Sequence, residues 1–181
     1  MQINLTDAAL VERCLGGDKE AFAGLVERHQ HAVFGLAMSM TGHNYAEAAD
    51  LAQEAFISAY KKLHSFDPHY LFRNWVLTIC ANLTKNRFRS IVRRRQVEEN
   101  YVERTFAASS GDDPRLEDVE DALRQLPEKT RVPLTLRYSE GLSFEEIASI
   151  LGIGLSAAKM RVKRGLEELT PKLNNRVKMQ P

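Results

Sequence analysis

Residues 142–166 read LSFEEIASILGIGLSAAKMRVKRGL, and this stretch decides how the C-terminal half of the chain folds. Ser143 followed by Glu146 forms a capping box, which predicts the start of a helix. Gly152 supplies the positive φ that a tight turn between two helices requires. The stretch therefore predicts a helix-turn-helix whose second helix runs to about Leu169, with Pro171 just beyond it.

The second helix of this motif presents a basic face. Ala158 and Val162 are expected to pack inside, against Ile147, Ala148 and Leu151 of the first helix. The opposite side can probe the major groove of duplex DNA. The predicted duplex contacts are Ser156, which would also cap the helix, Lys159, Met160, Arg161, Lys163 and Arg164. Of these, Arg161 is expected on a phosphate or in a structural ion pair. A helical hairpin with a solvated basic face is the alternative.

Apolar residues at helical spacing predict four helices upstream. The first is capped by Thr6 or Asp7 and ends at Gly16-Gly17. The others span about residues 18–40, 46–63 and 71–94. The inner face of the last of them is assigned to Trp75, Ile79, Leu83 and Phe88.

The apolar spacing typical of helices ends after Val97. Residues 107–114 have the Ala, Ser, Gly, Asp and Pro composition of a linker. Helices resume near residue 116, and Pro127 is expected to open one of them as its first residue. The predicted fold is all-α, with two small helical domains at residues 1–96 and 116–181 joined by a flexible linker at 97–115.

Charge is distributed unevenly, although the 181 residues carry a net charge of only +1. Acids dominate residues 98–121, whereas basic residues dominate both flanks. The densest basic run is Lys85, Arg87, Arg89, Arg93, Arg94 and Arg95. The two cysteines, Cys14 and Cys80, and the five histidines lack metal-ligand spacing, so no metal or cofactor is expected. Neither a signal peptide nor a membrane span is apparent, and we expect a soluble, cytoplasmic protein.

Two further segments resemble a known family. Residues 50–60, DLAQEAFISAY, resemble the D-L-x-Q-E-x-F-x-x-A-Y helix of bacterial sigma-70-type factors, and residues 75–89 resemble their next helix. Residues 126–128 and 136–138, with the helix-turn-helix, look like their domain 4. A chain with only these modules and a linker resembles the extracytoplasmic-function (ECF) group, which keeps domains 2 and 4.

The resemblance implies an initiation factor that is not an enzyme and binds core RNA polymerase and promoter DNA. Domain 4 would read the −35 element. Asp50, Gln53 and Glu54 would dock on the clamp helices of the largest polymerase subunit, with a second contact at the flap. The implied −10 DNA contacts are Phe66, Tyr70, Asn74, Asn82, Asn86, Arg87 and Arg89. An anti-sigma factor would hold the chain inactive, either in the cytoplasm or at the membrane.

Several alternatives stay open at this point. Asp50, Gln53 and Glu54 could form an ordinary solvated face, and the basic run could be a solvated helix end. Asn86 departs from the family's aspartate, which leaves the −10 preference open. A dimeric helix-turn-helix repressor or activator would bind a palindrome, but no dimerisation helix is evident. No P-loop or other catalytic motif supports an enzyme, which leaves a helical interaction protein as the third class.

Overall fold

The computed structural model describes residues 5–95 and 114–177, with the side chains of residues 5–89 and 119–173. Those residues form helices and no strand, which confirms the predicted all-α fold. The N-terminal half comprises α1 (Asp7–Leu15), α2 (Ala21–Met40), α3 (Tyr45–Lys61), the 3-10 helix η1 (Leu63–Ser65) and α4 (Phe72–Arg95). The C-terminal half comprises α5 (Pro114–Arg124), α6 (Glu128–Tyr138), α7 (Phe144–Leu151) and α8 (Leu155–Val177). Most of the predicted linker lies outside the described residues, so the domain limits stay a prediction.

Local signals place several helix ends. Thr6 caps α1, because its Oγ1 accepts a hydrogen bond from the Ala9 N–H at 3.3 Å. Asn44 caps α3 in the same way, with its Oδ1 accepting from the Glu47 N–H at 3.1 Å. Gly16 ends α1 as predicted.

Three predicted details of the C-terminal half are wrong. Pro127 is the N-cap of α6 rather than its first residue, since its extended ψ of 141° lies outside the helical region. Helix α8 starts at Leu155, because Gly154 O already accepts from the Ala158 N–H, so Ser156 lies inside the first turn. Pro171 lies within α8 rather than after it.

The face of α4 that packs inward also differs from the prediction. Trp75, Ile79 and Leu83 are only partly buried and lie at the margin of the core. Among the described side chains of α4, residues 72–89, the fully buried ones are Phe72, Val76, Leu77, Cys80, Ala81 and Thr84. This shift has a physical cause, because α4 is covered on two sides, by α2 and α3 and also by α7.

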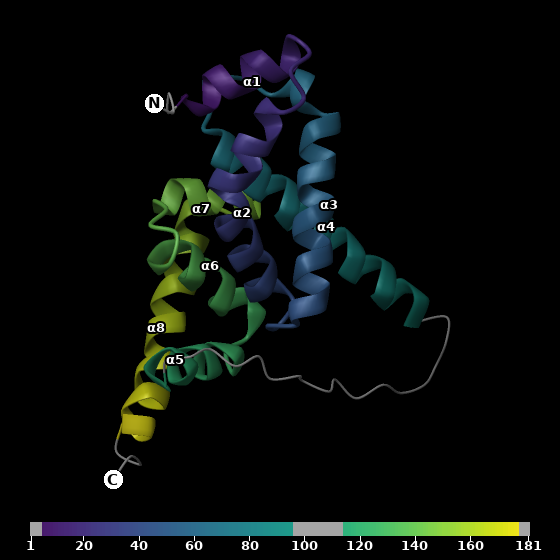
Figure 1. The fold of residues 1–181 in the computed structure, drawn as a ribbon. Helices are drawn as coiled ribbons and strands as arrows, with labels where there is room; N and C mark the ends of the chain where they lie inside the picture. Colours follow the sequence, from purple (N-terminus) through teal and green to yellow (C-terminus); the bar gives the residue numbers. More distant parts are fainter. Residues whose placement is uncertain (1–4, 96–113, 178–181) are drawn as a thin grey trace.

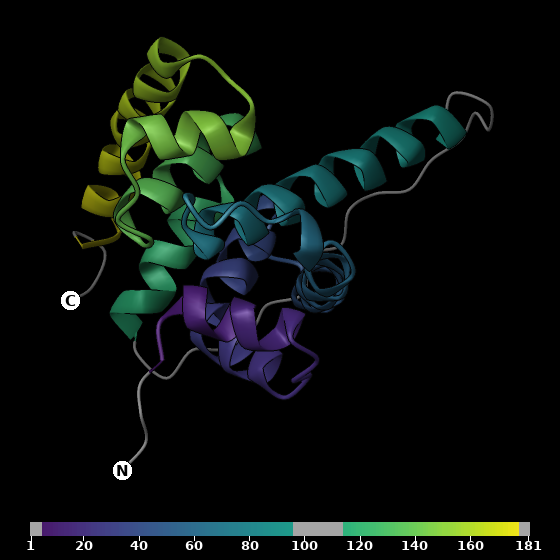
Figure 2. The ribbon, with the colours of Figure 1, turned by 90° about the horizontal axis from the view of Figure 1, so that it is seen from above.

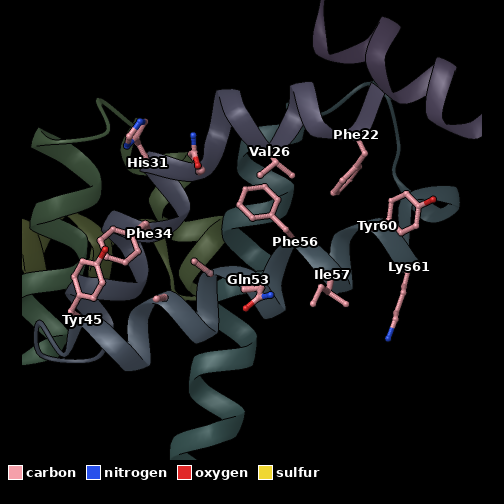
Figure 3. A pocket seen from close by; sticks show the side chains of 13 residues that line it. Phe22, Val26, His31, Phe34, Tyr45, Gln53, Phe56, Ile57, Tyr60 and Lys61 are labelled. Atoms are coloured by element: carbon pink, nitrogen blue, oxygen red, sulfur yellow. The ribbon is translucent and has the colours of Figure 1, made fainter. Parts of the chain in front are cut away.

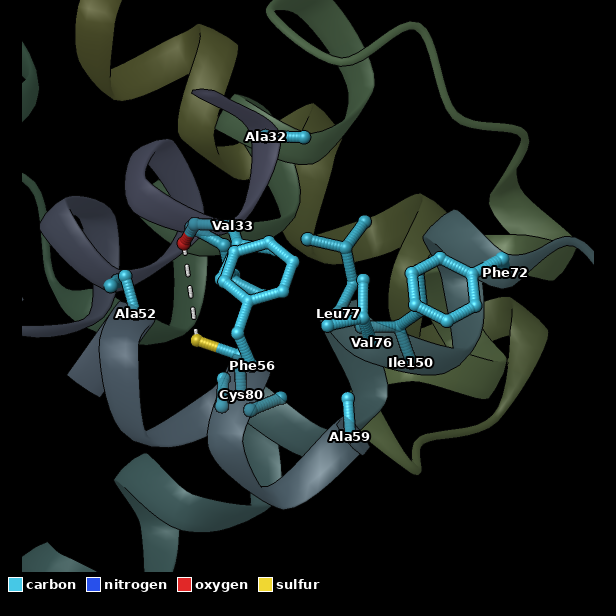
Figure 4. Packing of buried hydrophobic residues seen from close by; sticks show 14 of the residues in the cluster. Ala32, Val33, Ala52, Phe56, Ala59, Phe72, Val76, Leu77, Cys80 and Ile150 are labelled. Atoms are coloured by element: carbon cyan, nitrogen blue, oxygen red, sulfur yellow. Dashed lines mark hydrogen bonds between the residues drawn. The ribbon is translucent and has the colours of Figure 1, made fainter. Parts of the chain in front are cut away.

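The two halves pack directly against each other. In Figures 1 and 2 helices α6 and α7 lie beside α2 and the first turns of α4, while the far end of α4 projects away. Helix α2 contacts α6, and α4 contacts α7. Buried residues of both halves, including Leu77 of α4 and Ile150 of α7, belong to one continuous apolar cluster (Figure 4). The two halves therefore share a core.

Candidate nucleic-acid interface

The helix-turn-helix is fixed by the contacts that the sequence predicts. The Glu146 N–H donates to Ser143 Oγ at 3.1 Å, and the Ser143 N–H donates to Glu146 Oε2 at 2.8 Å. Gly152 adopts the left-handed conformation, with φ 61° and ψ 43°. The side chains predicted to face inward, Ile147, Ala148, Leu151, Ala158 and Val162, are all buried. The motif therefore holds α8 rigidly at the surface.

The outer face of α8 is open to solvent and largely basic. Four side chains of the predicted set, Lys159, Met160, Lys163 and Arg164, are exposed together, and Ser156 is exposed at the start of the helix. Met160, at 48% exposure, is the large apolar side chain among these cations. This combination suits a helix in the major groove, where cations meet phosphates and guanine edges and an apolar group meets thymine methyls.

Arg161 lies apart from this face. It is half-buried and close to Lys85 of α4. Burial lowers the pKa of the Lys85 ammonium, and the neighbouring charges of Arg89 and Arg161 lower it further. Arg161 is therefore less exposed than Lys163 and Arg164 and lies close enough to Lys85 for the two charges to interact.

Gly165 was missed by the sequence reasoning. It is buried where α8 crosses α6, and a Cβ at this position would lie 3.1 Å from Thr130 O and 3.5 Å from the Leu134 side chain. A side chain here would be tighter than most Cβ contacts, so glycine favours the close approach of the two helices. The available signal was an isolated glycine in the middle of a helical pattern.

Part of the predicted −10 surface forms a coherent exposed strip. Asn82, Asn86 and Arg89 occur at spacings of four and three residues on α4, and all three are exposed. Tyr70, in the loop before α4, is 71% exposed. Two amides and a guanidinium on one helical side can pair with base edges and phosphates, and the exposed ring of Tyr70 can stack on a base. The side chains of Arg93, Arg94 and Arg95 lie outside the described residues.

The other predicted −10 residues are placed differently. Phe66 is only 8% exposed and packs against Phe72 and Trp75, with ring centroids 5.6 and 5.1 Å away. Its assignment as a DNA contact is at odds with this burial, because the ring already fills the core beneath the loop. Asn74 Nδ2 donates to Glu146 Oε1 at 2.8 Å, and Arg87 lies 3.6 Å from the Glu54 carboxylate.

The polymerase-docking residues predicted on α3, Asp50, Gln53 and Glu54, are all exposed. Gln53 also lines an apolar groove of about 670 Å³ between α2 and α3, together with exposed Tyr45 and Ile57 (Figure 3). The patch is thus an acidic and amide edge beside an apolar groove, a composition suited to a protein partner.

His43 occupies an unusual position in the loop between α2 and α3. Its backbone has φ 66°, and neither ring nitrogen has a hydrogen-bond partner. Burial lowers the pKa of its imidazole from the usual 6.5 to about 4, and the charges of Arg131 and Arg124 act in the same direction. Asp121 opposes them. The loop therefore holds a neutral histidine against cations of α5 and α6.

Acidification is expected to destabilise the chain through this residue. Because the unfolded chain binds a proton at His43 near pH 6.5 and the folded chain only near pH 4, stability falls as pH drops through this window. Allowing for partial exposure, the loss from pH 7 to pH 5 is about 1 kcal/mol. Thermal melts across this range should show it.

The matched control is His43→Asn, because asparagine tolerates a positive φ and does not titrate. Its melting temperature should depend less on pH than that of the wild type. Equal pH dependence in the two proteins would contradict the role assigned to His43.

Other kinds of site find little support in the part of the chain that the structure describes. There, no three His, Cys, Asp or Glu side chains are placed to hold a metal ion. Burial raises the pKa of the Cys80 thiol to about 12, which makes it unreactive. Within residues 5–95 and 114–177, no helix is both long and apolar enough to cross a bilayer.

Comparison with known proteins agrees with the two modules. Residues 25–95 match sigma-70 region 2, and residues 116–169 match sigma-70 region 4. The RNA polymerase sigma-H factor of Pseudomonas aeruginosa is 35% identical, over 90% of this chain and 91% of that protein. The ECF RNA polymerase sigma-E factor of Haemophilus influenzae is also 35% identical, over 96% of this chain and 98% of that protein.

Solved structures are also similar to this chain. The sigma factor RpoE of Bartonella quintana, in complex with the anti-sigma factor NepR, superposes with a TM-score of 0.76 and 25% identity, over 84% of this chain and 96% of that chain. CnrH, in complex with the cytosolic domain of CnrY, gives 0.67 and 27%, over 93% and 97%. The chain belongs to the sigma-70 family, in its ECF group of alternative factors that direct RNA polymerase to promoters.

Proposed function

We propose that the outer face of α8 reads the −35 element as duplex DNA and that the exposed strip on α4 captures the melted −10 element. The observation that carries the first assignment is the exposed cluster of Lys159, Lys163 and Arg164 on a helix fixed by the helix-turn-helix core. Asn82, Asn86 and Arg89 support the second. Transcription from candidate promoters by core polymerase with and without the chain tests the proposal.

The chain performs no covalent chemistry in this scheme. Separating the strands costs about 1.4 kcal/mol per base-pair step, which captured bases and phosphate contacts must offset. Tyr70 and the amides of α4 are the groups available for bases, and Arg89 for the backbone. No stimulation of transcription across a promoter library would contradict the proposal.

Core polymerase is proposed to bind α3. The double substitution Asp50→Ala/Gln53→Ala should weaken this binding by about tenfold or more, because it removes a charged and an amide hydrogen-bonding group. Both side chains are exposed, and alanine is the best helix former, so the fold should be unaffected. The measurement is a fluorescence titration of the labelled chain with core polymerase.

Glu12→Ala on α1 serves as the control, because it removes an exposed carboxylate far along the chain from α3. It should leave the affinity for polymerase unchanged. Equal affinities of the α3 double variant and the wild type would show that Asp50 and Gln53 form only a solvated face.

An anti-sigma factor is the remaining proposed partner. One of the structural neighbours, RpoE, is a sigma factor bound to an anti-sigma factor, NepR. In this chain, the groove between α2 and α3 adjoins Gln53, so a partner seated there would also block polymerase. We place the chain in the cytoplasm, held at the membrane if this partner is membrane-bound. Purification of the fully active chain from its native cell without any partner would contradict this.

A further inference from the structure

Asp7 ties α1 to α2 through both oxygens of its carboxylate. Its Oδ1 accepts a hydrogen bond from Arg28 Nη1 at 2.5 Å, and its Oδ2 lies 2.8 Å from His29 Nε2. Because an ionised carboxylate only accepts, the imidazole donates the second of these hydrogen bonds. Arg28 Nη2 also donates to Leu5 O at 2.7 Å, just before α1 begins. The first turn of α1 is therefore fixed to the middle of α2.

His29 is buried where these two helices meet. It is only 7% exposed, and its ring packs against Phe72 in the first turn of α4, with the two ring centroids 5.6 Å apart. A buried polar atom needs a hydrogen-bond partner, and Asp7 is the partner of Nε2. The hydrogen bond thus fixes the orientation of the imidazole against which Phe72 packs.

Phe72 extends these contacts to the loop between η1 and α4. Its ring meets the ring of Phe66 with the centroids 5.6 Å apart, and Phe66 is the buried residue at the start of the loop. Helix α1 also contacts η1, which directly precedes the loop (Figure 1). Both ends of the loop are therefore supported by elements that Asp7 joins.

The loop is also braced from within. Asp67 Oδ1 accepts from the His69 N–H at 3.0 Å, and the Tyr70 N–H donates to Asp67 O at 3.1 Å. These bonds hold the backbone of the loop while the side chain of Tyr70, at 71% exposure, extends into solvent. A shift of the supports beneath the loop should therefore displace Tyr70 together with its neighbours.

We propose that Asp7 and His29 are positioning residues, which hold the loop of residues 66–71 in the conformation that captures the melted −10 strand. This inference rests on the proposed function, because it matters only if Tyr70 meets a base. Neither residue contacts DNA in this scheme, since His29 is buried and the carboxylate of Asp7 is bound to Arg28 and His29. Their effect is preorganisation, because a loop that is held in place before binding loses less conformational freedom when it captures a base.

The test compares two kinds of DNA bound to the complex of the chain with core polymerase. One is a single-stranded −10 oligonucleotide from a promoter that the wild-type chain transcribes, and the other is the −35 duplex of the same promoter. His29→Phe keeps a ring against Phe72 but removes the donor, and Asp7→Ala removes the acceptor. Each should weaken binding of the −10 strand by about fivefold or more and leave the affinity for the −35 duplex unchanged.

Two further variants serve as controls. His29→Gln keeps a side-chain N–H donor and should restore an affinity for the −10 strand close to that of the wild type. Glu12→Ala removes an exposed carboxylate from the same helix as Asp7 and should change the affinity for neither DNA.

A Tyr70→Ala background separates positioning from a general loss of structure. This variant lacks the ring that the loop presents, so adding His29→Phe should cause no further loss of affinity for the −10 strand. An equal loss with and without Tyr70 would overturn the positioning role. The same conclusion would follow from equal losses for the −10 and −35 DNA, or from unchanged −10 binding by His29→Phe and Asp7→Ala. Failure of the wild-type complex to bind the −10 strand would instead overturn the proposed function.

Discussion

Replacing Phe72 with alanine is expected to lower the free energy of unfolding by about 3–5 kcal/mol, because it empties a filled site in the core. The ring is 1% exposed at the first turn of α4. It packs edge-on against Phe22 and Phe66, with centroids 6.4 and 5.6 Å away. Since a domain is stable by only about 5–15 kcal/mol, this change should be obvious in urea denaturation followed by circular dichroism.

Leu71→Ala is the matched control. The neighbouring leucine is 64% exposed, so its truncation should change the free energy of unfolding by less than about 0.5 kcal/mol. If Phe72→Ala impaired promoter opening without lowering stability, Phe72 would contact DNA and its burial in the core would not describe the active state.

The core and the turn of the helix-turn-helix could be predicted because their determinants are local. The Ser143–Glu146 capping box joins residues three apart, and Gly152 supplies the left-handed conformation of the turn. Helix periodicity then assigned Ala158 and Val162 to the inside. Such features are encoded within a few residues and do not depend on how the rest of the chain packs.

The inner face of α4 could not be predicted in the same way. Periodicity finds one apolar stripe, whereas α4 is covered on two sides by different partners. The second partner, α7, lies about 70 residues away along the chain, and its contact with Asn74 has no signature in the sequence around that residue. The prediction therefore chose the stripe of Trp75 and Ile79, which lies at the margin.

The residues of the candidate site fall into the same two groups: those that local sequence predicts and those that tertiary contacts determine. The basic face of α8 and the acidic patch on α3 follow from helical spacing, because exposed positions on a single helix need only one buried stripe to fix them. The burial of Phe66 and the hydrogen bond of Asn74 to Glu146 could not be predicted, because tertiary contacts determine them. The buried position of Arg131 could not be predicted, because a single arginine in a helical sequence has no local signature of burial.

The double substitution Lys163→Ala/Arg164→Ala is expected to weaken binding of the polymerase-bound chain to a −35 duplex by about 30-fold or more. Each lost base or phosphate contact costs about 1–3 kcal/mol of binding free energy. Lys163 and Arg164 are both exposed on the same face of α8. The surface ion pair of Lys163 with Glu167, at 3.8 Å, contributes little to stability, so the fold should persist. The slope of log affinity against log salt should fall by about 2.

The charge-matched control, Lys19→Ala/Lys62→Ala, removes two exposed lysines from the N-terminal half. If the basic face of α8 were only solvated, the two double variants would lose equal, small amounts of affinity through net charge alone. If only the α8 variant loses affinity, the position of the two charges, rather than the total charge of the chain, determines binding. A loss that also differs between promoter sequences would assign at least one of Lys163 and Arg164 to a base edge, because phosphate contacts weaken binding to all sequences alike.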